Sequence, residues 1–149
     1  MQKTSVLIAG DHRGFGLKAK CIEWLGSHGY APLDLGTHSE ERCDALDYAK
    51  RMAGEFQVNP DQVGILICGS GQAMAMTANR YRLIRAALCL TPLMAVTSRE
   101  HNDTNVLAMG ADFMDEATAC KTIDAFLATP FLGGKYAERR DKLTALGGL

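Results

Sequence analysis

Apolar residues follow two alternating patterns along the whole chain. Short runs rich in β-branched and other apolar residues predict five strands, at residues 5–9, 31–35, 63–68, 84–88 and 106–109. Between these runs, apolar residues recur every three or four positions, as on one face of a helix. This spacing predicts helices at residues 15–27, 44–56, 92–100 and 115–127, a short helix up to residue 79, and a final helix at residues 135–146.

The run at residues 63–68, VGILIC, has no polar face, so we expect it to form a central strand that is buried on both sides. Strands that alternate with helices form a parallel sheet with helices on both faces. The pattern therefore predicts an α/β fold with a five-stranded parallel sheet and a C-terminal helical tail. The chain has 149 residues, which fits a single domain over residues 1–149.

Composition narrows the class of function. Hydrophobic residues make up 47% and charged residues 22% of the chain, as in ordinary soluble proteins. The formal net charge of −1 gives no sign of nucleic-acid binding, although a few local cations suffice to hold one phosphate group. The N-terminal apolar run is too short for a signal peptide, and no run reaches transmembrane length. We expect a cytoplasmic protein without membrane or nucleic-acid partners.

The five cysteines are widely scattered and form no CxxC pair, so we expect neither a disulfide framework nor a zinc site. Most of them are expected to be reduced thiols that pack as small hydrophobic residues. They are Cys21, Cys43, Cys68, Cys89 and Cys120.

In open parallel sheets, ligands bind at the carboxyl ends of the strands. The first predicted strand ends at Gly10, followed by Asp11, His12, Arg13 and Gly14. Free backbone N–H groups at such a strand-to-helix turn favour an anion. The alternative is that Asp11 merely caps the helix while His12 is solvated, and the motif alone favours neither interpretation.

Cys68 ends the predicted central strand, and Gly69-Ser70-Gly71-Gln72 follow it. Glycines let the backbone approach a ligand closely, and successive N–H groups can form a nest for an oxyanion. A thiol beside backbone dipoles can act as a base or nucleophile. Taken alone, a buried structural cysteine is the commoner outcome, and no lysine follows as a P-loop requires.

Two further polar segments are candidates for function. In the run of residues 99–105, His101 can act as an acid or base and Asn102 can donate to an oxygen, although an ordinary turn explains the run equally well. In the tail, Lys135 and Arg139 are four residues apart and share a helix face. They can clamp a phosphate, and a solvated charged helix is the alternative.

Six motifs match one known family in register over nearly the whole chain. They are GDHRGF at residues 10–15, D-x-GT at 34–37, ILICGSG at 65–71, TAN at 77–79, IRA at 84–86, and S-R-x-HNDTNVLAMG at 98–110. On these motifs the chain resembles the ribose-5-phosphate isomerase B / galactose-6-phosphate isomerase family. The resemblance implies a Rossmann-like, three-layer α/β/α fold and an aldose–ketose isomerase of phosphorylated sugars, as in pentose phosphate metabolism. It also implies that the enzyme needs no metal or cofactor.

The same resemblance implies a homodimer or homotetramer with active sites at the subunit interface, the tail at residues 133–149 packing on a partner subunit. In the mechanism that the resemblance implies, Cys68, with Ser70 beside it, would move a proton between C1 and C2 of the sugar through a cis-enediol(ate). His101 would help to open the sugar ring, and Asn102 would hold the developing oxyanion. The remaining implied substrate contacts are Asp11, His12, Asp44, Gly69, Gly71, Gln72, Ala73, Lys135 and Arg139.

Several positions depart from the family pattern. Ala45-Leu46 stand where Tyr-Pro is frequent, Asp112 stands where an arginine is common, and Lys135 replaces another arginine. Losing one guanidinium and exchanging another for a point charge weakens the expected phosphate clamp. We therefore expect the substrate to be a related sugar phosphate, of different length, rather than ribose 5-phosphate itself.

Two other functions fit parts of the sequence. A non-catalytic, sugar-phosphate-binding or regulatory homologue would explain the altered cations, but Cys68, His101 and Asn102 are all present and argue against it. A nucleotide-binding, flavodoxin-like domain fits the alternating pattern, but the chain lacks a G-x-G-x-x-G motif after its first strand.

Overall fold

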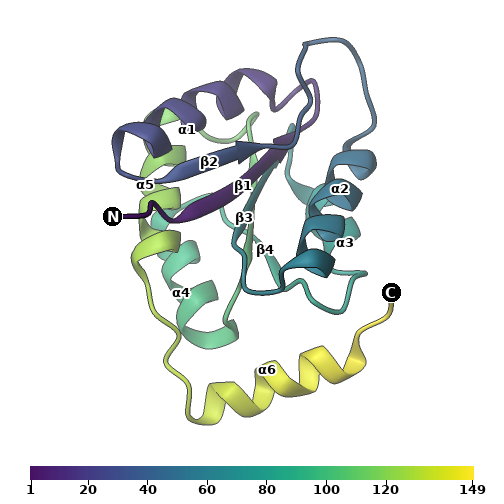
Figure 1. Cartoon of the computed structure of the whole chain (residues 1–149), viewed down its shortest axis with the longest axis vertical. Coiled ribbons are helices and arrows are strands. Elements are labelled where there is room, and N and C mark those ends of the chain that lie inside the picture. The colour runs from purple at the N-terminus through teal and green to yellow at the C-terminus, as the bar shows by residue number, and fades with distance from the viewer.

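The computed structural model describes residues 1–149, in which five strands alternate with helices (Figure 1). The strands are β1 (Ser5–Gly10), β2 (Ala31–Asp34), β3 (Gly64–Cys68), β4 (Ala86–Leu88) and β5 (Val106–Gly110). The helices are α1 (Phe15–Ser27), α2 (Ala45–Val58), α3 (Gln72–Ala78), α4 (Pro92–Asn102), α5 (Glu116–Ala128) and α6 (Lys135–Leu146). The predicted order of elements is confirmed.

The strands form one sheet in the order β2-β1-β3-β5-β4, and every neighbouring pair is parallel. All five residues of β3 are buried, as its wholly apolar sequence predicts. Side chains of a strand alternate between faces, so Ile65 and Ile67 pack on one side of the sheet while Leu66 and Cys68 pack on the other.

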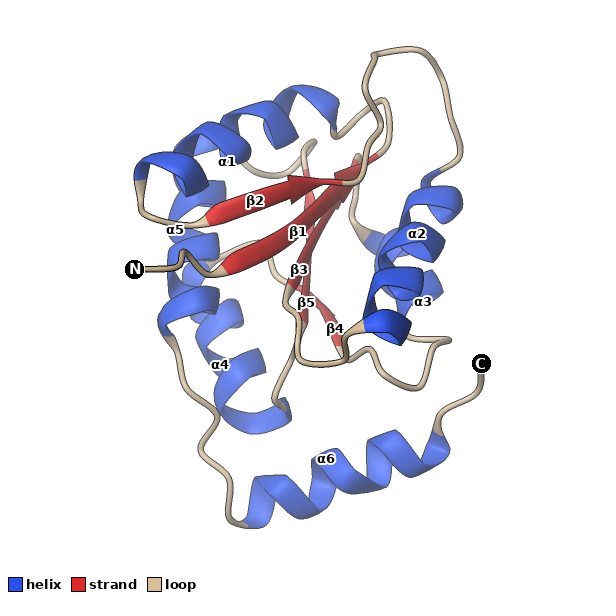
Figure 2. Cartoon of the chain, viewed as in Figure 1, coloured by secondary structure: helices blue, strands red, loops and turns tan.

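Helices cover both faces of the sheet (Figure 2). One core joins the sheet to α1, α4 and α5, and it contains Leu25, Ala95 and Phe126. The other joins the sheet to α2 and α3, and it contains Phe56 and Met74. The predicted three-layer α/β/α architecture is therefore confirmed.

The predicted boundaries lie within two residues of those in the structure, and two of the differences bear on the site. β4 begins at Ala86 instead of residue 84, because the Ile84 N–H donates to the Tyr81 carbonyl in a turn and the Arg85 N–H donates to Asn105 Oδ1. α4 continues past residue 100, so His101 and Asn102 are helical and only the residues after them form the connection to β5.

α6 lies apart from the three layers, below them in the view of Figure 1, and none of its residues is buried. Beyond it, the last residue returns to the loop before β4. The Leu149 N–H donates to the Arg80 carbonyl, and the Arg82 N–H donates to the Leu149 carbonyl, both over 2.9 Å. No helix is both long enough and apolar enough to cross a bilayer.

Candidate active site

The loops after β1 and β3 meet where the strand order changes direction, which is the usual ligand-binding place in such sheets. The Asp11 N–H donates to the Ile67 carbonyl over 3.2 Å. A Cβ on Gly14 would lie 2.2 Å from the Ile67 carbonyl oxygen, so only glycine permits this approach. Close packing therefore fixes the GDHRG and CGSG loops against each other.

The thiol of Cys68 is held inside the loop that follows β3. It is 5% exposed, and its Sγ accepts a hydrogen bond from the Gly71 N–H over 3.1 Å. Gly71 is the N-cap of α3 and has a φ of 77°, a conformation that favours glycine. The N–H groups of Gly69, Ser70 and Ala73 donate to no other group of the chain, which leaves them available to an oxyanion beside the sulfur.

Ser70 and Gln72 complete the outer side of this loop. The Ser70 Oγ accepts from the Gln72 N–H over 3.3 Å, and the Ser70 side chain is only partly buried. Gln72 and Ala73 are exposed at the start of α3. These residues therefore form the rim of the loop, with Cys68 at its base.

Asp11 is buried and caps the turn after β1. Its Oδ1 accepts from the N–H groups of Arg13 and Gly14, both over 3.0 Å. Its other oxygen, Oδ2, accepts no hydrogen bond within the chain. Asp11 therefore caps the turn before α1 and not α1 itself, whose N-cap is Gly14 with no side-chain hydrogen bond, and the second carboxylate oxygen of Asp11 stays available.

His12 is half-buried and held by the loop before α2. The Cys43 N–H donates to His12 Nδ1 over 3.2 Å, so a neutral imidazole carries its proton on Nε2. Asp44, next to Cys43, is exposed and caps α2 by accepting from the Leu46 N–H. An open hollow of about 510 Å³ is lined by His12, Arg42, Cys43, Asp44 and Ala45.

His101 and Asn102 lie at the opposite end of the sheet from Cys68. α4 runs back from the carboxyl end of β4 and ends where β5 begins. At that end the Gly64 N–H donates to the Asn105 carbonyl, whereas Cys68 pairs with Gly110. Four residues of strand span ~13 Å. One chain therefore does not bring Cys68 together with His101.

The implied phosphate cations of the tail gather with His101. Its imidazole stacks on Tyr136, with ring centroids 4.5 Å apart. The Lys135 Nζ lies 5.2 Å and the Arg139 Cζ 5.7 Å from the centroid of the same phenol ring. Sequence reasoning missed Tyr136, although its position between the two cations was a usable signal.

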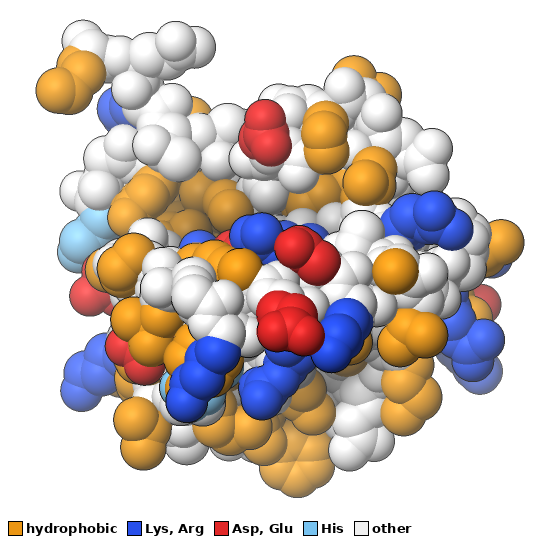
Figure 3. All heavy atoms as spheres, turned by 90° about the horizontal axis from the view of Figure 1, so that it is seen from below, with side chains coloured by type: hydrophobic (Ala, Val, Ile, Leu, Met, Phe, Trp, Pro, Cys, Tyr) orange, Lys and Arg blue, Asp and Glu red, His pale blue; other side chains and the backbone are white.

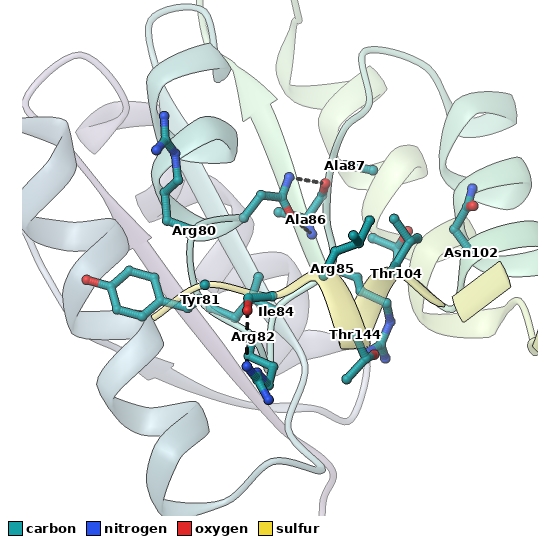
Figure 4. A pocket seen from close by; sticks show the side chains of 15 residues that line it. Arg80, Tyr81, Arg82, Ile84, Arg85, Ala86, Ala87, Asn102, Thr104 and Thr144 are labelled. Carbon is teal, nitrogen blue, oxygen red and sulfur yellow. Dashed lines mark hydrogen bonds between the residues drawn. The ribbon is translucent and has the colours of Figure 1, made fainter. Parts of the chain in front are cut away.

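Asn102 lies on the side of the molecule where β4 has no further strand partner. It lines a cavity of about 490 Å³ between α6 and the β4 region (Figure 4). It also lines a hollow of about 450 Å³ beside α4, where Leu93 is 73% and Met94 44% exposed. This side of the chain therefore combines an open strand edge with exposed apolar side chains.

Asp103, which the sequence analysis did not single out, binds three arginines at the same end. Its carboxylate accepts from Arg85 over 3.4 Å, from Arg99 over 3.0 Å and from Arg140 over 2.9 Å. Burial lowers the pKa of Arg85, while the charge of Asp103 opposes that shift. Seen from the α6 side, Lys and Arg side chains and acidic groups are interspersed (Figure 3). The cluster ties α6 to the end of α4.

No group of three or more His, Cys, Asp or Glu side chains is arranged to hold a metal ion. The chemistry that the described groups offer is proton transfer by a thiol or imidazole, next to backbone donors for an oxyanion.

Comparisons with known proteins agree on one family. Residues 6–143 match the family model of the Ribose/Galactose Isomerase proteins. Ribose-5-phosphate isomerase B of Escherichia coli is 39% identical over 136 residues, which cover 91% of each chain. A putative sugar phosphate isomerase of Rickettsia bellii is 39% identical, over 96% of this chain and 99% of the relative.

Solved structures extend the match to three dimensions. A ribose 5-phosphate isomerase of Thermotoga maritima superposes with a TM-score of 0.93 at 42% identity, over 97% of this chain and 99% of that one. Ribose-5-phosphate isomerase B of Mycoplasma genitalium, solved with bound ribulose-5-phosphate, gives a TM-score of 0.92 at 32% identity. The superposed residues make up 98% of this chain and 97% of the Mycoplasma chain. With this fold and these relatives, the chain belongs to the ribose/galactose isomerase family and is an isomerase.

Proposed function

We propose that this protein interconverts an aldose phosphate and a ketose phosphate, with Cys68 as the base that moves the proton. The observation that carries the proposal is the position of Cys68 Sγ, held by the Gly71 N–H beside the unpaired N–H groups of Gly69 and Ser70. A proton next to a carbonyl is weakly acidic, so its removal needs both a positioned base and stabilisation of the enediolate.

The proton balance of the reaction is internal. The Cys68 thiolate takes the proton from C2 of the open-chain aldose, and the electron pair of that bond forms the enediolate. The loop N–H groups hold the negative O1 of this enediolate. The proton of the O2 hydroxyl then moves to O1, and the proton on Cys68 returns to C1, which gives the ketose. One carbon is oxidised as its neighbour is reduced, so no external oxidant enters the step.

We further propose that the site is complete only in a homodimer. Asp11, His12 and Cys68 belong to one end of the sheet, whereas His101 belongs to the other. In a dimer with two-fold symmetry, the Cys68 end of each chain can meet the His101 end of the other chain, which yields two equal sites. The open β4 edge, the exposed Leu93 beside it and the cavity along α6 offer the surface for the second copy.

In this arrangement the Cys68 end of one chain faces the α6 end of its partner. The partner's His101 and the partner's Asn102 then assist ring opening and hold the oxyanion. The partner's Lys135 and the partner's Arg139 meet the phosphate opposite His12. This placement gives a function to Lys135 and Arg139, the two exposed cations of α6 that form no ion pair within the chain, unlike Lys142, which pairs with Glu138.

A complementation experiment tests both parts of the proposal. Cys68→Ala and His101→Ala are each expected to be nearly inactive on a pentose phosphate. Co-expressed in equal amounts, they form mixed dimers in which one site carries both substitutions and the other carries none. About half of the dimers are mixed and half of their sites are intact, so about a quarter of the wild-type activity should return.

Two controls define the result. Cys68→Ala co-expressed with Cys68→Ala,His101→Ala should stay inactive, because no intact site can form. If the first mixture also stays inactive although tagged subunits co-purify, both residues act within one chain and the shared site is refuted. Full activity of Cys68→Ala alone would refute the assigned base.

For the substrate, we propose a sugar phosphate related to ribose 5-phosphate, because Asp112, Lys135 and Ala45-Leu46 alter the family pattern. Tetrose, pentose and hexose phosphates are to be compared by kcat/KM. If ribose 5-phosphate exceeds every other sugar in the panel, the expectation of a different chain length is wrong.

A further inference from the structure

The side chain of Arg13 crosses the carboxyl ends of three neighbouring strands. It starts in the turn after β1, lies over the loop after β3, and its Nη2 pairs with Asp112 Oδ2 in the loop after β5. A Cβ on Gly69 would lie 2.9 Å from the Arg13 Cζ and 3.0 Å from its Nε and Nη1. The guanidinium therefore lies flat on Gly69, the residue that follows Cys68.

Both ends of this bridge are tied to the candidate site. The backbone N–H of Arg13 donates to Asp11 Oδ1 over 3.0 Å, and the backbone N–H of Asp112 donates to the Gly69 carbonyl over 2.9 Å. The Arg13 side chain is nevertheless 58% exposed. A fixed but solvent-accessible position is typical of a group that meets a ligand.

Most donors of the guanidinium are free. Arginine has five N–H donors, and the side chain of Arg13 makes one hydrogen bond, through Nη2 to Asp112. Its Nε and Nη1 have no acceptor within the chain. His12, the preceding residue, has its Nδ1 occupied by the Cys43 N–H, so its Nε2 is also available.

We propose that Arg13 is a specificity-determining residue that binds the phosphoryl group of the substrate, with Asp112 as its positioning residue. The planar fork of a guanidinium matches two oxygens of a phosphoryl group, and an orientation fixed in advance reduces the entropy lost on binding. Asp112 accepts from only one of the two N–H donors of Nη2. The other Nη2 donor and the donor next to it, on Nε or Nη1, remain as a fork for two oxygens of the ligand. The phosphorylated sugar in this inference rests on the proposed function, whereas the anion site itself does not.

Inorganic phosphate is the probe, because its binding needs no turnover. Its affinity is measured as the dependence of Tm on phosphate concentration, at constant ionic strength held with chloride. Charge-assisted bonds of this kind are worth roughly 10- to 100-fold in affinity, so Arg13→Ala should weaken phosphate binding by at least about 10-fold. Arg13→Lys keeps the charge without the fork and should fall in between. Lys20→Ala, on an exposed cation of α1 outside the site, should behave as wild type.

Kinetics separate ligand binding from a structural role. Arg13→Ala should raise KM for the phosphorylated sugar more than it lowers kcat, and Asp112→Ala should do the same, with Asp112→Asn partly restoring KM through its amide oxygen. Unchanged phosphate affinity in Arg13→Ala, or no response of the wild type to phosphate, overturns the proposal. Phosphate binding through Arg13 without isomerisation of any sugar would instead refute the proposed function alone.

Discussion

The imidazole of His101, at the end of α4, stacks on the phenol ring of Tyr136 in α6 with ring planes 12° apart. This contact joins two elements that the sequence separates by a whole strand and helix. Because Lys135 and Arg139 flank the same ring, the orientation of His101 and the position of the tail cations depend on one side chain. We therefore expect Tyr136 to act as a positioning residue.

Replacing Tyr136 tests this dependence. Aromatic stacking is worth about 0.5–1.5 kcal/mol beyond the buried area, which corresponds to roughly 2- to 12-fold. We expect Tyr136→Leu to lower kcat/KM by that factor, while Tyr136→Phe keeps the stack and most of the activity. Steady-state kinetics of both variants provide the measurement. Equal losses in the two would assign the effect to the hydroxyl group and contradict the role of stacking.

Removing the thiol of Cys68 should slow proton transfer strongly without unfolding the chain. Cys68→Ala deletes one buried sulfur at the edge of a core, and we expect turnover to fall by about 10²–10⁴-fold. Exchange of the C2 proton of the substrate with deuterium from solvent, followed by NMR, measures the step itself. Cys120→Ala is the matched control, because Cys120 is also buried but lies in α5, which packs on the opposite face of the sheet from the Cys68 side chain. Proton exchange at the wild-type rate in Cys68→Ala would assign the base to another group.

The fold could be predicted from the sequence because the hydrophobic pattern records burial directly. VGILIC has no polar face, and β3 is accordingly the central strand. The start of the edge strand β4 was the least accurately predicted of these boundaries. The Arg85 N–H donates to the side chain of Asn105 instead of to a neighbouring strand. A side chain from twenty residues away decides that boundary, and local periodicity contains no information about it.

The candidate site was predicted in pieces, but their arrangement was not. That α4 returns His101 to the far end of the sheet depends on chain direction, and that Tyr136 meets it depends on packing between distant helices. Asp112 was interpreted only as a lost arginine, whereas its carboxylate pairs with Arg13. Pairings between loops far apart in sequence leave no periodic signal in one chain.

Substitution by alanine should harm the protein at one glycine, Gly110, and stabilise it at another, Gly54. A Cβ on Gly110 would lie 2.7 Å from the Ser70 carbonyl oxygen, so Gly110→Ala must displace the loop beside Cys68. Displacements of about 1 Å can cost 100-fold in rate, and we expect a large loss of kcat. Gly54, inside α2, has nothing within 4 Å of its Cβ position, so Gly54→Ala should raise the free energy of unfolding by about 0.5–1 kcal/mol. Thermal unfolding and kinetics of both variants check this, and full activity of Gly110→Ala would contradict it.

The buried thiol of Cys21 should lower the free energy of unfolding as the pH rises into the alkaline range. Burial raises the pKa of Cys21 from 9.0 to about 12, with a smaller contribution from neighbouring Cys120. Below pH 9 the thiol is neutral in the folded and unfolded chains and adds no pH dependence. Above it, the unfolded chain loses this proton while the folded chain keeps it, so the free energy of unfolding falls by up to about 1.4 kcal/mol per pH unit. Cys21→Ala removes this contribution, and its unfolding free energy should decline less steeply between about pH 8 and pH 10.5 in urea titrations. Parallel declines for the two proteins would show that Cys21 ionises as readily in the folded chain as in the unfolded one.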